Sequence, residues 1–329
     1  MNNRERILAT LRGETTDRPP VSFWRHFYQR EDSAAGLAEA MLDFQRRFDW
    51  DFMKVNPRAS YYGEGWGLKV RFRGDLGLKP ERIDFPIKDA RDWEKIRSLS
   101  PEAGVLGEQL EALVRIRQGL GSEVPIVQTL FTPLSIAGDL VDSSDQLLRD
   151  LKENKEMVHH ALKEIAATFA LYARACLRAG ADGVFLATTE WASRDLLNHD
   201  SYLEFGLPYD LEVLKGAAEG SFNILHVCGR NNMLKELLGY PVHAFNWAAT
   251  DPTNPSLGEI LHLSGKAVIG GIDEEGTLRH GSWEDLKQEL ERAKEQSGGK
   301  RWMLGPGCAI PTDVPEPRLR MVRQEIASW

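Results

Sequence analysis

The sequence lacks the features that identify membrane, exported and disulfide-rich proteins. Its 329 residues contain no run of about 18 consecutive apolar residues, so the sequence predicts no transmembrane helix. Charged residues such as Arg4, Glu5 and Arg12 interrupt the first segment, which excludes the apolar core that a signal peptide needs. Three cysteines are too few for a disulfide framework in a chain of this length. We therefore expect a cytoplasmic protein with reduced thiols.

Basic residues are also fewer than acidic residues. Lysine and arginine together number 41 against 49 aspartate and glutamate residues, which gives a formal net charge of −8, and no long basic block occurs. Contacts to phosphate supply most of the affinity for nucleic acids, and anionic membranes attract basic segments, so we expect neither partner. Internal repeats, low-complexity tracts and linkers are absent as well. Residues 1–329 are therefore predicted to form one domain.

The sequence does contain a regular alternation of short apolar runs with longer amphipathic stretches. Most runs are rich in β-branched or aromatic residues and bounded by Gly, Pro, Asn or Asp, as buried parallel strands are. The runs cover residues 20–24, 51–55, 124–130, 183–187, 222–227, 244–247, 266–270 and 301–304. These eight runs predict eight parallel strands.

The amphipathic stretches predict helices over residues 145–180, 282–297 and 315–328. Eight strands with helices between them predict a single (β/α)8 TIM barrel of the α/β class. The alternative is an open doubly wound sheet, which usually has a glycine-rich loop after its first strand. Here that position reads Trp24-Arg25-His26, which is no such loop.

One segment does not fit a compact β/α unit. Residues 61–98 contain several glycines, with Val70 and Phe72 between them. We therefore predict an inserted hairpin or lid in this part of the chain.

Histidine and cysteine residues occur at the predicted ends of two strands. His226 and Cys228 end the fifth run, and Cys308 follows the eighth. TIM barrels carry their functional groups at the carboxyl ends of strands, and alternation in an extended chain places His226 and Cys228 on one face. One imidazole and two thiolates favour zinc, with a fourth position open for catalysis. The alternative is that these cysteines pack as small apolar side chains, as we expect of Cys176.

Two acidic residues follow other predicted strands, and we treat both as candidate catalytic residues. Glu190, after the fourth run, is a candidate fourth ligand or proton acceptor, or else a solvated loop acid. Asp273, after the seventh run, is a candidate for hydrogen bonding to substrate, or else it caps the next helix.

Four further residues at strand ends are candidates for substrate binding. Lys54 and Asn56 flank the end of the second run and would suit an anionic group, unless they lie at a solvated rim. Phe131 and Trp247 would line an apolar pocket, although aromatic residues at such positions are more often part of the core.

Several short motifs follow one another in a specific order along the chain. They are Arg18-Pro19-Pro20-Val21, Thr129-Leu130-Phe131-Thr132-Pro133-Leu134, Gly180-Ala181-Asp182-Gly183, Phe205-Gly206-Leu207-Pro208-Tyr209, His226-Val227-Cys228-Gly229, and Gly307-Cys308 followed by Pro315-Glu316. Their order and spacing resemble the uroporphyrinogen decarboxylase superfamily over nearly the whole chain. The resemblance implies a (β/α)8 barrel, in agreement with the number of predicted strands.

The superfamily has two chemistries, which differ in the residues they need. Its decarboxylases use two arginines after the first strand and a histidine after the last. In this chain Arg25 matches the first arginine, but Gln29 stands in place of the second. Pro306, which cannot exchange a proton, replaces the histidine. These departures argue against decarboxylation.

The other branch comprises corrinoid-dependent methyltransferases, whose His-x-Cys…Cys zinc motif is similar to His226, Cys228 and Cys308. The resemblance implies a zinc-dependent methyltransferase that moves a methyl group between a corrinoid (a methylcobamide) on a partner protein and a small-molecule thiol or similar nucleophile. Arg25 would hold the charged end of that acceptor. The alternatives are a uroporphyrinogen decarboxylase, which needs no metal, and a barrel that binds a corrinoid or tetrapyrrole without catalysis.

Overall fold

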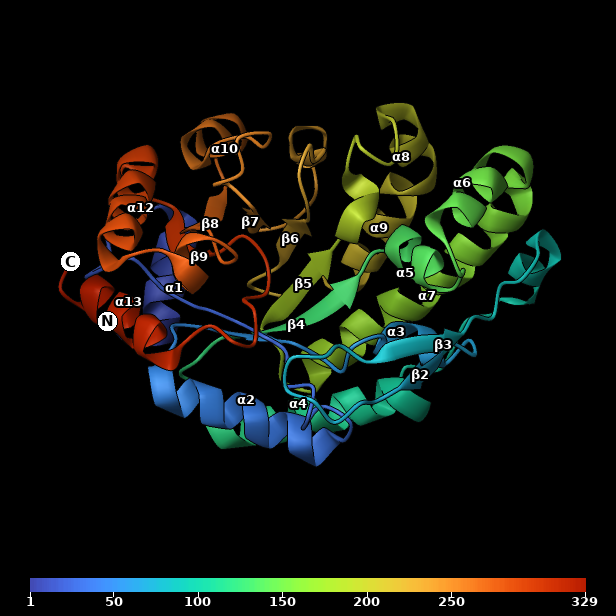
Figure 1. Cartoon of the computed structure of the whole chain (residues 1–329), viewed down its shortest axis with the longest axis horizontal. Coiled ribbons are helices and arrows are strands. Elements are labelled where there is room, and N and C mark those ends of the chain that lie inside the picture. The colour runs from blue at the N-terminus through green and yellow to red at the C-terminus, as the bar shows by residue number, and fades with distance from the viewer.

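A curled sheet of seven parallel strands forms the centre of the computed structural model, which describes residues 1–329 (Figure 1). In their order across the sheet, the strands are β1 (Met53–Val55), β4 (Ile126–Phe131), β5 (Gly183–Ala187), β6 (Ile224–Val227), β7 (Ala244–Trp247), β8 (Ala267–Ile272) and β9 (Trp302–Pro306). Successive strands pair in parallel, and helices connect them around the outside of the sheet (Figure 1). The chain therefore has an α/β, TIM-like architecture.

The helices account for most of the remaining chain. The α-helices are α1 (Asn3–Arg12), α2 (Ala34–Phe48), α3 (Tyr61–Glu64), α4 (Gly104–Leu120), α5 (Pro133–Asp139), α6 (Ser144–Glu153), α7 (Lys155–Arg178), α8 (His199–Phe205), α9 (Leu207–Gly216), α10 (Leu257–Ser264), α11 (Thr277–His280), α12 (Trp283–Ser297) and α13 (Glu316–Ala327). Short 3-10 helices are η1 (Ala90–Lys95), η2 (Thr189–Ala192) and η3 (Leu234–Leu237). No helix combines the length and the apolar content that crossing a membrane requires.

The prediction of a strand at residues 20–24 is wrong. This segment forms a single parallel bridge, between Val21 and Leu304 of β9. Two prolines precede Val21, and their missing N–H groups limit the ladder that the segment can form. The segment is still held on both sides, because the Ser22 N–H donates to the Leu304 carbonyl (3.1 Å) and the Asp51 N–H donates to the Val21 carbonyl (2.9 Å). It therefore lies between β9 and the residues that lead into β1.

The other seven predicted strands are confirmed, and β5 and β7 have the predicted bounds. The predicted helix over residues 145–180 is wrong in one respect, since it divides into α6 and α7 at Asn154. Asn154 has a non-helical backbone, and its side chain donates to Asp150 Oδ1 (3.0 Å). Local hydrogen bonds of this kind compete with helix continuation. Ser282 caps α12 as expected, and α13 falls within the predicted range.

Two apolar clusters surround the sheet. The larger fills the space between the sheet and the outer helices. The smaller lies inside the curled sheet and contains Ile7, Trp24, Phe52, Val127, Phe185, Ala187, Phe222, Ile224, Ala244, Ala267, Ile269 and Met303. Alternate residues along the strands face these two cores, as a two-residue period dictates. Packing on both faces prevents each strand from turning about its own axis. The side chains at the carboxyl ends of the strands therefore point in fixed directions.

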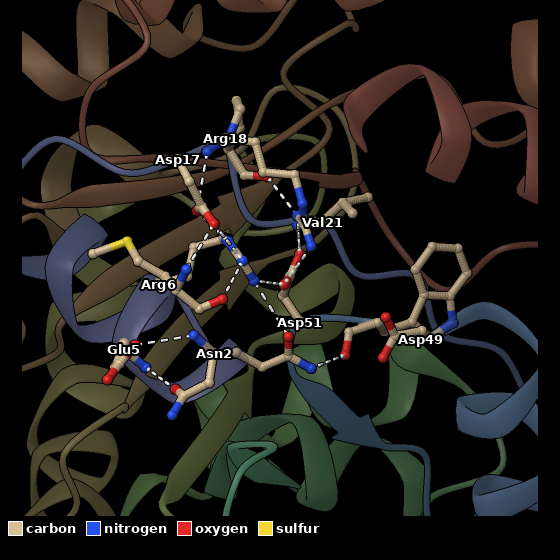
Figure 2. A network of polar contacts seen from close by, with 12 residues as sticks. Asn2, Glu5, Arg6, Asp17, Arg18, Val21, Asp49 and Asp51 are labelled. Atoms are coloured by element: carbon tan, nitrogen blue, oxygen red, sulfur yellow. Dashed lines mark hydrogen bonds and ion pairs between the residues drawn. The ribbon is translucent and has the colours of Figure 1, made fainter. Parts of the chain in front are cut away.

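Ion pairs hold the N-terminal segment against the start of β1 (Figure 2). Asp51 is completely buried, and its carboxylate accepts from Arg6 (2.5 Å) and from both terminal nitrogens of Arg18 (2.6 and 3.0 Å). The Val21 N–H also donates to Asp51 Oδ2 (2.8 Å). Arg6 reaches Asp17 as well (2.7 Å). One carboxylate therefore ties helix α1, the segment around Val21 and the entry to β1 together.

The segment 61–98 contains the pair of antiparallel strands β2 (Lys69–Arg71) and β3 (Glu81–Asp84). The loop between them reaches the chain after β9, because Gly77 lies close to Thr312. The action of this segment as a lid stays a prediction.

Candidate active site

The structure brings His226, Cys228 and Cys308 together from two strands that are distant in sequence. His226 is on β6, Cys228 follows β6 directly, and Cys308 follows β9. Their potential ligand atoms all lie within 4.8 Å of one another. His226 is buried, whereas both cysteines are half-buried. The cluster lies at the carboxyl ends of the strands, where TIM-like folds carry their active sites.

Asn246 fixes the proton of the His226 ring, and the sequence analysis did not identify it. Asn246 pairs with His226 across β6 and β7, and its Oδ1 lies 2.7 Å from His226 Nδ1. The amide nitrogen of Asn246 donates to the carbonyls of Ile269 and Pro306, both at 3.0 Å. Because this fixes Oδ1 as an acceptor, His226 Nδ1 carries the proton and Nε2 is left with a free lone pair. Metal-binding histidines are commonly oriented in this way.

The pKa values of the two cysteines are shifted in opposite directions. The pKa of Cys308 is lowered well below its ordinary value, chiefly by its interaction with the neighbouring Cys228 thiol. The pKa of Cys228 is raised well above its ordinary value by the same interaction with Cys308 and by burial. Two sulfurs and an imidazole nitrogen at this separation are a donor set that suits a zinc ion with three protein ligands. The residues present therefore fit the metal that the sequence implied.

Two glycines bring the cysteines into place. A Cβ on Gly307 would lie 2.6 Å from the Cα of Ala248, so only glycine lets the chain before Cys308 pass so close to β7. Gly229 follows Cys228 with φ of 79°, a backbone conformation that strains other residues. Both positions lie next to a sulfur of the candidate site.

Glu274 is a second residue that the sequence analysis did not identify. Its side chain is 8% exposed, and its Oε2 accepts from the N–H of Gly307 (2.8 Å), one residue before Cys308. Burial raises the pKa of Glu274 to about 8, and negative charge on Cys308 adds to the effect. The signal in the sequence is a run of three acids, Asp273 to Glu275, directly after a buried strand.

The two acids that the sequence did suggest have different surroundings. Asp273 Oδ1 accepts from the N–H groups of Glu275 (3.1 Å) and Gly276 (2.9 Å), so its carboxylate supports the turn before α11. Glu190 lies in η2 and is exposed, yet its charge contributes to the raised pKa of Cys228. Glu190 therefore combines a position near the sulfurs with access to water.

Lys54 and Asn56 are buried, so the alternative of a solvated rim is wrong. The exposed fraction is 6% for Lys54 and 1% for Asn56, and Lys54 Nζ donates to Asn56 Oδ1 (2.6 Å). Burial lowers the pKa of Lys54 to about 7, and negative charge on Cys308 and Cys228 opposes this effect. The ammonium group therefore belongs to the same site as the two sulfurs.

Arg25 is held against the chain that follows Cys308. It is 8% exposed, and one terminal nitrogen donates to the Thr312 carbonyl (3.2 Å). Its guanidinium lies over the rings of Phe44 (5.1 Å) and Phe27 (5.4 Å), while its Nε has no hydrogen-bond partner. Arg25 therefore lies beside the cluster, next to the chain that follows Cys308.

The two aromatic candidates lie in the packed interior. Trp247 is completely buried in the outer core, and its indole N–H donates to the Pro255 carbonyl (2.8 Å). Phe131 is half-buried and packs against Tyr62, with 4.4 Å between ring centroids. Of the two, Phe131 is the one that keeps surface for contact with another molecule.

A cleft of about 310 Å³ borders the chain after Cys308. It is lined by His26, Tyr28, Gly77, Glu275, Arg279 and residues 309–313. Gly77 belongs to the loop between β2 and β3, so this loop forms one wall of the cleft. The cleft therefore lies beside the chain that carries Cys308 out of β9.

Comparison with known proteins shows the family and the fold of the chain. A methylcobamide:CoM methyltransferase, MtbA, of Methanosarcina acetivorans is 25% identical over 339 residues, which cover 96% of this chain and 95% of the relative. A uroporphyrinogen decarboxylase of Nitrosococcus oceani is 26% identical over 343 residues, which cover 95% and 92%. A solved structure described as a methyltransferase from Methanosarcina mazei has the same fold, with a TM-score of 0.84 at 23% identity and 99% of each chain covered. The family model described as uroporphyrinogen decarboxylase (URO-D) matches residues 2–329, and the chain belongs to this family.

Proposed function

We propose that this chain is a zinc-dependent methyltransferase that transfers a methyl group from a methylcobamide to a thiol. The observation that carries the proposal is the cluster of His226, Cys228 and Cys308, whose ligand atoms lie within 4.8 Å of one another at the carboxyl ends of the strands. The names of relatives such as MtbA, a methylcobamide:CoM methyltransferase, support the same chemistry. In the reaction a sulfur–carbon bond forms and the cobalt–carbon bond breaks, with its electron pair left on cobalt.

Each residue of the candidate site would have its own role in this reaction. His226 Nε2, Cys228 and Cys308 would hold the zinc ion, which lowers the pKa of an incoming thiol so that it reacts as the thiolate. Asn246 orients the imidazole, and Glu274 holds Gly307 and so the position of the Cys308 sulfur. Glu190 is exposed and near Cys228, so it can pass the thiol's proton to water. The fourth metal position is left to the substrate.

The remaining candidates concern binding. Arg25 stays our candidate for the charged end of an acceptor, because its Nε has no partner within the chain. Phe131 is our candidate for an apolar contact, while Asp273 and Trp247 are assigned to the structure around the site. We further propose that residues 1–329 act as one domain and that the corrinoid arrives on a partner protein.

The test is methyl transfer from free methylcobalamin to 2-mercaptoethanol, followed by mass spectrometry of the methylated thiol. We expect turnover by the zinc-loaded wild type and its loss in His226→Ala and Cys308→Ala. Cys176→Ala is the matched control, because Cys176 is buried in α7, within the outer core and away from the cluster. Turnover that is the same in all four proteins would contradict the proposal.

Decarboxylation is the second candidate function, because relatives named uroporphyrinogen decarboxylase also match most of the chain. Loss of carboxyl groups from uroporphyrinogen measures it directly. We expect no useful rate, since Pro306 ends β9 and has no group that could exchange a proton. Turnover on the order of 1 per second would reverse the ranking of the two functions.

A further inference from the structure

Lys54 is a buried basic residue without a carboxylate partner. It lies in the middle of β1 with 6% of its side chain exposed. Its Nζ donates to Asn56 Oδ1 (2.6 Å), and it takes part in no ion pair. An ammonium group is costly to bury unless charges of opposite sign compensate it. The position therefore needs a source of negative charge other than Asp or Glu.

Aromatic rings connect Lys54 to the candidate metal ligands. Its Nζ lies 4.7 Å from the centroid of the Phe185 ring and 5.8 Å from that of Trp24. The same Phe185 ring stacks on His226, with 5.1 Å between centroids. Phe185 thus contacts both the ammonium group and the imidazole of the cluster, and the charges that act on Lys54 are those of Cys308 and Cys228.

The other charged groups near the cluster do not take this role. Arg25 interacts with the charges of Glu316 and Arg47 rather than with the cysteines. Glu274 has a pKa raised to about 8, so it is mostly protonated at neutral pH. Glu190 is exposed and negative. Lys54 is therefore the buried basic group that shares the Phe185 ring with the cluster.

The charge of the loaded site shows what this cation could balance. A neutral imidazole, two thiolates and a divalent ion sum to zero, so the site becomes negative when a bound thiol loses its proton. We propose that Lys54 is a positioning residue that balances this negative charge on the sulfur of the substrate. The inference rests on the proposed function. Asn56 and the two rings enclose Nζ, so Lys54 acts on the sulfur through the low-dielectric interior and does not grip a charged substrate tail.

The test compares two thiol probes on zinc-loaded protein by calorimetry in two buffers. 2-Mercaptoethanol has no charge apart from its sulfur, whereas 3-mercaptopropionate also has an anionic tail. We expect Lys54→Met to bind both probes about tenfold more weakly at pH 7, and the pH at which binding releases a proton to rise by about one unit. Lys54→Arg keeps the charge and should retain most of the wild-type affinity. Zinc content should not change in either variant.

Lys266→Met is the matched control. Lys266 is also partly buried, lies 5.4 Å from the Phe245 ring centroid and has a pKa lowered by burial, but it directly precedes β8, at the amino end of that strand. It should bind both probes like the wild type. Lys54→Gln repeats the measurement with a polar side chain in case Lys54→Met does not fold.

The outcomes distinguish failure of the role of Lys54 from failure of the proposed function. Wild-type affinity and an unchanged pH profile in Lys54→Met or Lys54→Gln would overturn the role of Lys54 and leave the proposed function intact. A loss confined to 3-mercaptopropionate would overturn it too, because the ammonium would then hold the tail. If zinc-loaded wild type binds neither thiol, the thiol acceptor of the proposed function fails first, and the inference fails with it.

Discussion

At the scale of single residues, the candidate site depends on a polar side chain that no metal would touch. Asn246 is fully buried, and it uses both ends of its amide, accepting from His226 and donating to the carbonyls of Ile269 and Pro306. Three neighbouring strands thereby determine which nitrogen of His226 faces the cysteines. A flip of the ring, or a shift of its proton to Nε2, would leave buried polar groups unpaired.

We predict that Asn246→Leu weakens zinc binding about 10- to 100-fold, because the side chain that orients His226 is lost. Competition with a chromogenic chelator measures the affinity. Asn223→Leu is the control, since Asn223 is equally buried at the start of β6 and bonds to Val184 and Ala217 at the far end of the strand. Equal losses of zinc affinity in the two variants would show a general effect of destabilisation instead.

The sequence predicted the three ligand candidates but not the residues that support them. His226, Cys228 and Cys308 could be found because their residue types are rare and their positions at strand ends follow from alternation. Asn246 and Glu274 act through contacts between strands that are adjacent only in the fold. A polar residue inside the run 244–247 was the available signal, but nothing in one sequence says which neighbour it faces.

At the scale of elements, a buried carboxyl group joins three parts of the outer layer. Asp210 of α9 is completely buried, and its Oδ2 accepts from Tyr202 of α8 (2.8 Å) and from Tyr240, after η3 (2.7 Å). Its Oδ1 has no partner. Burial raises the pKa of Asp210 to about 7, against an ordinary value near 3.9. These elements follow β5 and β6, so their packing supports the chain around Cys228.

We predict that this group makes the protein less stable as the pH rises. Below about pH 4 the carboxyl is protonated in both states, but between about pH 4 and 7 only the unfolded state ionises. The folded state then loses up to about 1.4 kcal/mol of stability per pH unit from this group. Urea unfolding at pH 5 and pH 7 should show the loss in wild type and a smaller loss in Asp210→Asn. Identical pH dependence in both proteins would contradict the assignment.

Element boundaries show where local sequence signals stop being sufficient. The runs at 183–187 and 244–247 gave the bounds of β5 and β7, because flanking residues end each apolar run sharply. The run at 20–24 is also largely apolar, yet the prolines at its start and its place between β9 and β1 leave one bridge. The break between α6 and α7 depends on Asn154, whose side-chain bond was invisible in the apolar spacing.

At the scale of the whole molecule, one buried ion-pair network ties helix α1 and the segment around Val21 to the entry of β1 (Figure 2). We predict that Asp51→Asn lowers the free energy of unfolding by about 3 kcal/mol, because the buried Arg6 keeps only Asp17 and the half-buried Arg18 loses its carboxylate partner. Urea unfolding measures the change. Asp43→Asn is the control, since Asp43 pairs with Arg30 (2.8 Å) at the surface and should cost less than about 1 kcal/mol. Similar costs for both would refute the special role of Asp51.

The account of the whole molecule rests on a metal held where two distant parts of the chain meet. Metal analysis of the purified protein tests this most directly, in wild type, in the Cys228→Ala, Cys308→Ala double variant and in Cys176→Ala. We predict about one zinc ion per chain in wild type and in Cys176→Ala, and almost none in the double variant. Full zinc occupancy in the double variant, or none in wild type purified with zinc present, would contradict the account.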